Sequence, residues 1–100
     1  TASVYSAMKG AIEVWTRYLA QELGPRGIRV NAIAPGATAT DFSGGAVRDN
    51  AQLRAALDAT VALGHVGDPD DIGAAIAGIL DPRMSWVTGQ RIEASGGQRL

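Results

Sequence analysis

The chain has 100 residues, of which 46% are hydrophobic, with nine basic and ten acidic side chains and a formal net charge of −1. This length suffices for one small domain with a hydrophobic core. The sequence contains no apolar segment long enough to cross a membrane and no basic cluster. We expect no signal peptide and neither a membrane nor a nucleic acid as a partner. It has no cysteine and a single histidine, His65. We therefore expect no disulfide, no bound metal and a cytoplasmic location.

A helical pattern of apolar residues near the start of the chain predicts a helix over residues 4–23. Gly24 and Pro25 are its expected end, because glycine is common just past a helix and proline cannot continue one. A helix that is apolar on two sides needs a cover on both, so we expect one cover to be a partner subunit or preceding sequence. The two stripes run through Val4, Met8, Ile12, Trp15, Leu19 and Leu23, and through Ala7, Ala11, Val14 and Tyr18.

The next segments predict a strand, a loop and a second helix. Residues 28–34 are apolar enough for a buried strand of a parallel sheet, which ends at Pro35-Gly36. Residues 37–50 are rich in Thr, Gly, Asp and Asn and predict a long mobile loop of the kind that often covers a substrate site. Residues 51–62 predict a helix, and residues 64–67 a break.

The last third of the chain predicts a helix followed by a strand. Asp68-Pro69-Asp70-Asp71 has the features of a helix start: a capping acid, a proline at the first helical position and a capping-box acid. This helix is expected to stop by Asp81-Pro82. Residues 90–94 then predict a short strand that ends at Ser95-Gly96-Gly97. The alternation of helices and strands is typical of a layered α/β fold.

Tyr5 and Lys9 are four residues apart in the first predicted helix, so their side chains share one face. A phenol has a pKa of about 10 in isolation, and a nearby ammonium favours its ionised form. The pair could therefore act as a general acid/base and its electrostatic partner. Taken alone, the same spacing also fits two exposed polar residues on a solvated helix.

Four blocks of sequence follow one another in an informative order. They are Tyr5-Ser6-Ala7-Met8-Lys9; residues 29–36, Arg-Val-Asn-Ala-Ile-Ala-Pro-Gly, with Thr40 after them; residues 67–72, Gly-Asp-Pro-Asp-Asp-Ile; and Val87-Thr88-Gly89-Gln90 with Gly96-Gly97. Together they closely resemble the C-terminal part of the short-chain dehydrogenase/reductase family, over essentially the whole chain. The resemblance implies an α/β fold, the C-terminal part of a doubly wound, Rossmann-like parallel sheet.

The resemblance also implies an activity: an oxidoreductase that transfers hydride between NAD or NADP and a carbonyl or alcohol substrate. A carbonyl reductase or alcohol dehydrogenase is favoured over an isomerase or epimerase. By this resemblance Tyr5 is the catalytic acid/base, which donates a proton to the carbonyl oxygen during reduction. Lys9 would bind the nicotinamide ribose hydroxyls and favour the phenolate form of Tyr5.

Further site residues are implied after the first strand. Pro35, Gly36, Thr38 and Thr40 are expected to lie against the cofactor, Thr40 matching the family's threonine. Residues 37–62 would form the variable substrate lid, in which Phe42 either touches the substrate or packs within the loop. The resemblance further implies a homodimer or homotetramer that assembles through helix 4–23 and the C-terminal strand.

The sequence also departs from the family pattern. It contains no glycine-rich dinucleotide fingerprint, and neither the residue that selects NAD or NADP nor the family's catalytic serine and asparagine is found. Ser3 is too close to Tyr5 to serve as that serine, and the chain opens with Thr1 rather than Met. We therefore expect residues 1–100 to be the C-terminal catalytic and substrate portion of one Rossmann domain, without its N-terminal cofactor-binding half. The alternative is a non-catalytic fragment or oligomerisation module, and the substrate and the choice between NAD and NADP stay open.

Other conspicuous residues are expected to have structural roles. His65 has no evident catalytic partner, and Asn31 is expected to satisfy backbone groups beside its strand. Trp15 and Trp86 are expected in a core or an interface. The acids of residues 68–71 are explained by helix capping better than by a metal site.

Overall fold

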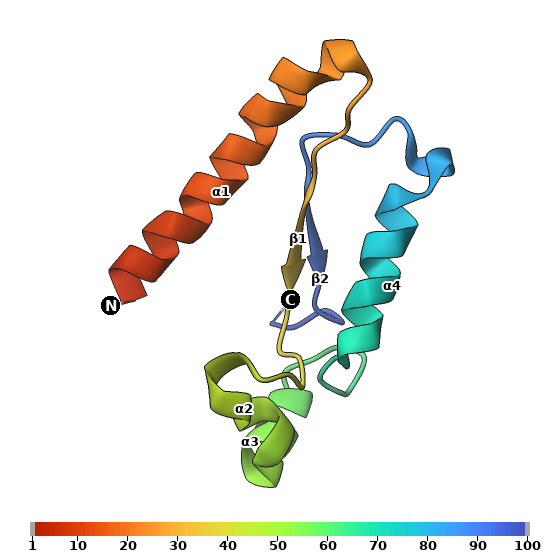
Figure 1. Ribbon diagram of the computed structural model, residues 1–100. Helices are drawn as coiled ribbons and strands as arrows, with labels where there is room; N and C mark the ends of the chain where they lie inside the picture. The colour runs from red at the N-terminus through yellow and green to blue at the C-terminus, as the bar shows by residue number, and fades with distance from the viewer. Residues whose placement is uncertain (1, 100) are drawn as a thin grey trace. The chain divides into compact units, whose positions relative to one another are not determined.

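The computed structural model describes residues 2–99 (Figure 1). These residues divide into two compact units. The first unit comprises the chain up to Ile33 together with Ile79–Ile92, and the second comprises Ala34–Gly78 together with the chain from Glu93 on. Within residues 2–99, no helix combines the length and the apolar character that crossing a bilayer requires.

The first unit begins with a long helix, α1 (Ala2–Leu23), which confirms the helix predicted over residues 4–23. A short 3₁₀ turn, η1 (Gly24–Arg26), continues it with Pro25 inside the turn. The glycine that takes the left-handed conformation is Gly27, with φ 72°, rather than the expected Gly24. Its N–H donates to the Gly24 carbonyl at 2.8 Å, so the chain makes one more turn before it leaves the helix.

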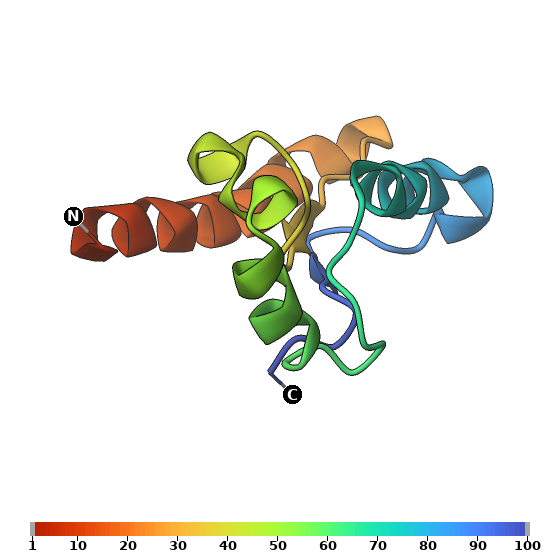
Figure 2. The same cartoon turned by 90° about the horizontal axis from the view of Figure 1, so that it is seen from below.

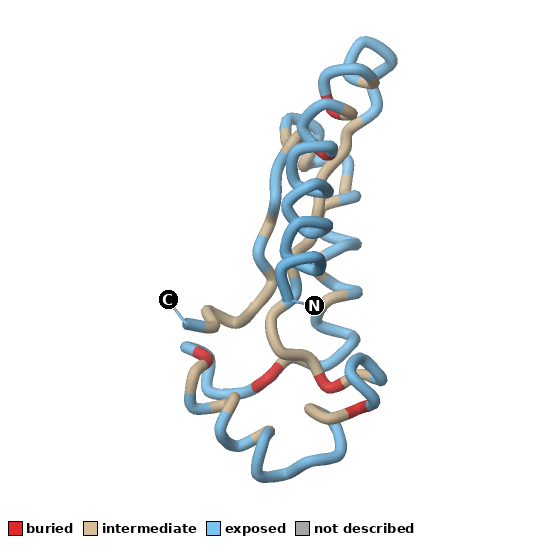
Figure 3. Tube along the Cα trace, turned by 90° about the vertical axis from the view of Figure 1, so that its left-hand side faces the viewer, coloured by how far each residue is buried: buried red, intermediate tan, exposed pale blue. Residues whose placement is uncertain are grey.

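The apolar stripes of α1 are largely exposed in residues 2–99, whereas Thr16 and Ala20 are its buried residues. Met8 and Trp15 are each 62% exposed, and Val4 is 67% exposed. Figure 3 shows the same distribution, with few buried positions along the trace. The prediction that these stripes require a cover from outside this part of the chain therefore stands as a prediction.

Two short strands, β1 (Ala32–Pro35) and β2 (Arg91–Ala94), pair with each other in a two-stranded sheet. The Ala32 N–H donates to the Gln90 carbonyl at 2.8 Å, and the Gly36 N–H to the Ala94 carbonyl at 3.1 Å. Both partners advance by four residues in the same direction, so the strands are parallel, as expected.

The predicted strand over residues 28–34 was wrong at both boundaries, since β1 begins at Ala32 and includes Pro35. The residues before Ala32 bond to a turn instead of a strand. Val30 receives the Gly89 N–H at 2.7 Å on its carbonyl and donates its own N–H to the Thr88 hydroxyl at 3.1 Å. Apolar composition alone could not distinguish these two kinds of pairing.

The second unit contains two consecutive short helices, α2 (Phe42–Asp49) and α3 (Ala51–Asp58), which lie next to each other in both ribbon views (Figures 1 and 2). The loop predicted over residues 37–50 was therefore wrong only near its end, because Ser43, Gly44 and Gly45 have left-handed φ values of 53°, 69° and 78° within the stretch assigned to α2. The helix predicted over 51–62 is confirmed but ends at Asp58, because the chain then turns so that Ala62 and Leu63 can donate to the Gly97 and Gly96 carbonyls. Asn50 caps α3 by accepting the Leu53 N–H at 2.9 Å.

The helix α4 (Pro69–Leu80) begins where its sequence predicts. The Asp71 carboxylate accepts the Asp68 N–H at 2.8 Å, which is the capping-box contact expected of that acid. A 3₁₀ turn, η2 (Pro82–Met84), follows after Asp81, and β2 confirms the strand predicted over residues 90–94. The buried apolar residues of the second unit are Ala39, Val61 and Val66, the last only 1% exposed.

Candidate active site

Helix α1 brings Tyr5 and Lys9 together, as their spacing predicts. The Lys9 Nζ lies 5.4 Å from the centre of the Tyr5 ring, within the range of a cation–π attraction. Tyr5 is 54% exposed, so its hydroxyl can be reached from outside this unit. The arrangement places an ammonium over the face of a phenol ring on an exposed side of α1.

The segment that follows β1 is held in place on two sides within the second unit. The Ala37 N–H donates to the Gln98 side-chain oxygen at 2.8 Å. The Ala37 carbonyl accepts the Gly67 N–H at 3.0 Å, and the Gly67 carbonyl accepts the Ala39 N–H at 2.9 Å. These bonds fix the backbone from Gly36 to Thr40, the stretch in which the cofactor-binding residues were predicted.

The two threonines of this segment use their hydroxyls locally. Thr38 Oγ1 donates to the Gly36 carbonyl at 2.9 Å, and Thr40 Oγ1 accepts the Phe42 N–H at 3.2 Å. Thr38 therefore keeps an acceptor capacity and Thr40 keeps its O–H as a donor.

The predicted site residues thus fall into two groups. Tyr5 and Lys9 belong to the first unit, whereas the segment Pro35–Thr40 and Phe42 belong to the second. Phe42 opens α2 and is 72% exposed.

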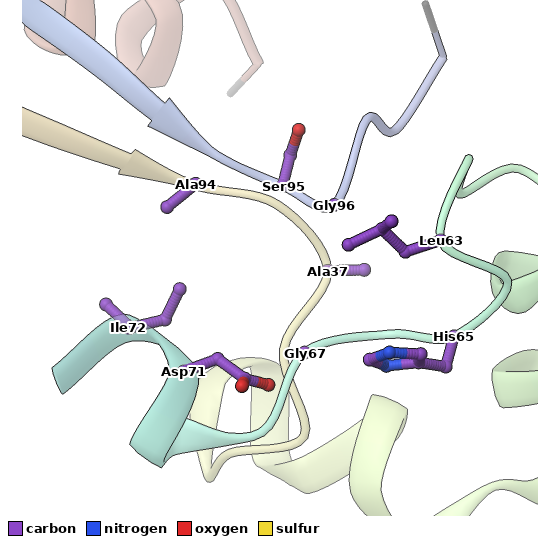
Figure 4. Close-up of a pocket in the computed structure, with 9 residues that line it drawn as sticks. All are labelled: Ala37, Leu63, His65, Gly67, Asp71, Ile72, Ala94, Ser95 and Gly96. Atoms are coloured by element: carbon purple, nitrogen blue, oxygen red, sulfur yellow. The ribbon is translucent and has the colours of Figure 1, made fainter. Parts of the chain in front are cut away.

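Sequence reasoning missed a hollow of about 270 Å³ in the second unit (Figure 4). Its polar groups are His65, Asp71 and Ser95, and Figure 4 shows the first two on either side of Gly67. Its walls come from separated segments, so no local sequence signal could reveal it. The full lining is Ala37, Leu63, His65, Gly67, Asp71, Ile72, Ala94, Ser95 and Gly96.

The polar groups of this hollow already have hydrogen-bond partners. The His65 Nδ1 lies 2.9 Å from the Val66 carbonyl oxygen, and the Asp71 carboxylate caps α4. The Ser95 hydroxyl donates to Glu93 at 2.7 Å. Among residues 2–99 there is no group of three His, Cys, Asp or Glu side chains that could hold a metal ion.

Asn31 and Arg29, which precede β1, form a network of side-chain hydrogen bonds in the first unit. Asn31 donates its side-chain amide to the Val87 carbonyl at 3.0 Å and accepts the Gln90 N–H at 3.1 Å, which confirms its predicted backbone role. Arg29, which the sequence did not single out, donates to the Val87 carbonyl at 3.2 Å and to the Ile79 carbonyl at 2.9 Å. These hydrogen bonds join the end of α4 and the chain that follows it to the residues that lead into β1.

Arg48 of α2 forms ion pairs with two neighbouring carboxylates, Asp41 and Asp49. Arg48 donates to both carboxylate oxygens of Asp49, each at 2.7 Å, and also pairs with Asp41. The hydrogen bond from Arg48 lowers the pKa of Asp49, and the two carboxylates raise the pKa of Arg48. The Arg48 and Asp49 side chains are therefore ionised at neutral pH.

Comparison with protein families matches residues 1–99 to the family described as enoyl-(acyl carrier protein) reductase. An uncharacterized oxidoreductase of Methylorubrum extorquens is 42% identical over 99 residues, which are 99% of this chain and 40% of that protein. The 3β-hydroxysteroid dehydrogenase 1 of Eggerthella lenta is 41% identical over 96 residues, which are 96% of this chain and 36% of that protein.

The chain is also similar in structure to solved reductases. The promiscuous reductase LugOII, which catalyses keto-reduction at C1 during lugdunomycin biosynthesis, matches with a TM-score of 0.82 and 41% identity over 93% of this chain and 36% of its own. A 3-oxoacyl-[acyl-carrier protein] reductase from Brucella melitensis with bound NAD matches with a TM-score of 0.80 and 33% identity over 96% of this chain and 33% of its own. A blue fluorescent protein from a metagenomic library, in complex with NADPH, matches with a TM-score of 0.79 and 33% identity over 95% of this chain and 37% of its own.

The chain spans between 35% and 43% of the length of its most similar curated relatives. Its α/β architecture with a parallel pair of strands agrees with that of the matched structures.

Proposed function

This chain belongs to the short-chain dehydrogenase/reductase family, and we propose that it carries the proton-transfer residues and part of the nicotinamide site of an enzyme that interconverts a carbonyl and an alcohol. The observation that carries the proposal is the Tyr5–Lys9 pair on α1, with Lys9 Nζ 5.4 Å from the Tyr5 ring centre. The relatives are named as dehydrogenases and reductases, which supports an oxidoreductase.

The cofactor of the proposed enzyme is a nicotinamide dinucleotide, because similar proteins bind NAD or NADPH. When bound, it supplies or takes up the hydride. The fixed backbone of residues 36–40 and the hydroxyls of Thr38 and Thr40 suit its carboxamide group, and the Lys9 ammonium suits the ribose hydroxyls. Nothing in these residues distinguishes NAD from NADP.

The protein's own contribution is a proton and an oriented site. In reduction, the Tyr5 O–H donates its proton to the carbonyl oxygen as the carbonyl carbon becomes an alcohol carbon. In oxidation, the Tyr5 phenolate takes the proton of the alcohol. Lys9 supports both directions, because its positive charge stabilises the phenolate that forms or reacts.

The test is Tyr5→Phe in the full-length protein, which removes one oxygen atom and leaves the ring. We expect carbonyl reduction to fall by about 10²- to 10⁴-fold, while NADH or NADPH still binds, as followed by the fluorescence of the nicotinamide. Tyr18→Phe on the same helix is the matched control, since Tyr18 is 62% exposed, and it should keep full activity. Full turnover by Tyr5→Phe would overturn the role proposed for Tyr5.

The exposed stripes of α1 favour a second candidate function for the 100-residue chain itself, assembly. Val4, Met8, Ile12 and Trp15 are between 45% and 67% exposed along one side of the helix. Burial of such a surface is a common basis of subunit association. We expect sedimentation of the chain to show a dimer or larger species, and calorimetric titration with NADH and NADPH to show no tight binding. A monomer that binds either nucleotide tightly would overturn this second candidate.

A further inference from the structure

The two units of the chain differ in charge. The second unit, which holds the segment after β1 and the lid, residues 37–62, has seven acidic side chains and three arginines, a net charge of −4. The first unit has six basic and three acidic side chains, a net charge of +3. The environment that surrounds the proposed cofactor segment in its own unit is therefore negative.

Both arginines of the lid are paired with carboxylates. Arg48 is bonded to Asp41 and Asp49, so this cluster keeps one net negative charge. The guanidinium of Arg54 lies 3.8 Å from the Asp68 carboxylate. Neither arginine is presented as a single positive charge, which is the form in which a guanidinium binds a phosphate.

The negative cluster also lies next to the proposed site. Asp41 follows Thr40 directly in the chain, and Thr40 accepts the Phe42 N–H at 3.2 Å, so the acid is fixed at the start of the lid. The Asp41 side chain is 92% exposed despite its bond to Arg48. The Asp41 carboxylate would repel a negatively charged substrate that approached Thr40.

The apolar side chains of the lid and its neighbourhood are exposed. Phe42 is 72% exposed at the start of α2, and Leu63, just past the lid, is 71% exposed beside the hollow of Figure 4. These two residues offer apolar surface to a small molecule. The third arginine of this unit is Arg99, whose N–H donates to the Thr60 carbonyl at 2.9 Å.

We propose that the substrate is a free, uncharged and largely apolar carbonyl compound or alcohol, and not an acyl thioester carried on a phosphopantetheine arm. The inference rests on the proposed function, since it concerns the substrate of that same site. An acyl group on a carrier protein or on coenzyme A always brings at least one phosphate, which needs cationic partners near the mouth of the site. The names of the matched proteins point to different substrates, namely groups on an acyl carrier protein, a 3β-hydroxysteroid and an intermediate of lugdunomycin biosynthesis.

The experiment compares three forms of one 3-oxoacyl group in the full-length protein with NADH and NADPH. They are the ethyl ester, the uncharged N-acetylcysteamine thioester and the coenzyme A thioester. We expect kcat/KM for the two uncharged forms to exceed that for the coenzyme A thioester by at least about tenfold at low salt, and the difference to shrink in about 0.5 M salt as the charges are screened.

Two variants test whether the lid charges are responsible. Asp41→Asn combined with Asp49→Asn removes both carboxylate charges from Arg48 and should reduce the discrimination by at least about threefold. Asp70→Asn is the matched control, because it removes one exposed carboxylate of α4 from the same unit and should leave the discrimination unchanged.

The outcomes separate this inference from the proposed function. Equal or faster turnover of the coenzyme A thioester, or unchanged discrimination in the double variant, would overturn the inference and leave the proposed function standing. If Arg17→Gln with Arg26→Gln then abolished turnover of that thioester, the phosphate would be bound by the first unit, where both arginines are exposed. No oxidation of NADH or NADPH with any of the three compounds would overturn the proposed function, and the inference with it.

Discussion

Gly36 lies so close to Ser95 that a β-carbon at residue 36 would fall 2.6 Å from the Ser95 Cβ and 2.8 Å from its Cα. Gly36 is not among the glycines with a positive φ, so the requirement is for space and not for an unusual backbone conformation. The contact joins the first residue after β1 to the first residue after β2. It explains a glycine at this position independently of any cofactor.

We predict that Gly36→Ala destabilises the chain by about 1–3 kcal/mol, because neither Ser95 atom can swing away from the added methyl group. Chemical denaturation measures the change. Gly73→Ala in α4 is the control, since a β-carbon there has no atom within 4 Å and should stabilise the helix by about 0.5–1 kcal/mol. A Gly36→Ala variant as stable as the parent would show that the two strand ends can separate without cost.

Removal of the charge at Lys9 should affect both cofactor binding and the rate. We predict that Lys9→Met in the full-length protein raises the KM for the nicotinamide cofactor and lowers kcat, each by about 10- to 100-fold, because the ribose loses a donor and the phenolate loses its neighbouring cation. Steady-state kinetics measures both. Lys9→Arg keeps a positive charge and should retain more of the rate than Lys9→Met, so equal rates for the two variants would contradict an electrostatic role.

The parts of the fold that the sequence predicted well depend on local signals. The period of α1 and the capping residues of α4 lie within the elements themselves, and both helices begin or end within two residues of the prediction. The predicted loop over residues 37–50 failed for a non-local reason. Ser43, Gly44 and Gly45 all have positive φ, a turn that Arg48 closes through Asp41 and Asp49 before α3 begins. The sequence composition shows the glycines of this turn, but it does not show that Arg48 pairs with Asp41 and Asp49.

The candidate site likewise has one part that a local sequence signal predicted and one part that depends on contacts between distant residues. Tyr5 and Lys9 meet because i and i+4 share a face on any helix, so their contact follows from spacing alone. The contacts that hold Ala37 come from Gln98 and Gly67, which are 61 and 30 residues away in sequence. Single-sequence patterns carry no information on such pairs, and the hollow beside Ala37 was missed for the same reason.

Asn31 makes two backbone contacts that can be separated by substitution. We predict that Asn31→Ala destabilises the chain by about 1–3 kcal/mol, because the Val87 carbonyl and the Gln90 N–H both lose their partner. Asn31→Asp can still accept the Gln90 N–H but cannot donate to Val87, so it should keep part of the stability at neutral pH. Chemical denaturation of the three proteins measures this order. If Asn31→Ala were as stable as the parent, the two hydrogen bonds of Asn31 would contribute nothing to the stability of the chain before β1.

Asp81 provides a prediction of pH dependence. Its carboxylate accepts hydrogen bonds from the Arg83 side chain at 2.8 and 2.9 Å and from the Arg83 N–H at 2.8 Å, and these bonds lower the pKa of Asp81, the side-chain bonds having the larger effect. A folded-state pKa below the unfolded value means that the folded chain binds fewer protons. The stabilisation is therefore complete above the unfolded pKa of about 4 and is lost as the pH falls through the folded value.

We accordingly expect Asp81→Asn to be less stable than the parent at about pH 7, and the difference to shrink as the pH is lowered to about 2. Asparagine can still accept the Arg83 N–H, so the variant isolates the charged contacts with the guanidinium. Denaturant titrations of both proteins across this pH range measure the difference in the free energy of unfolding. A difference that stayed constant with pH would show that the charge of Asp81 does not contribute to the stability of η2, which this residue caps.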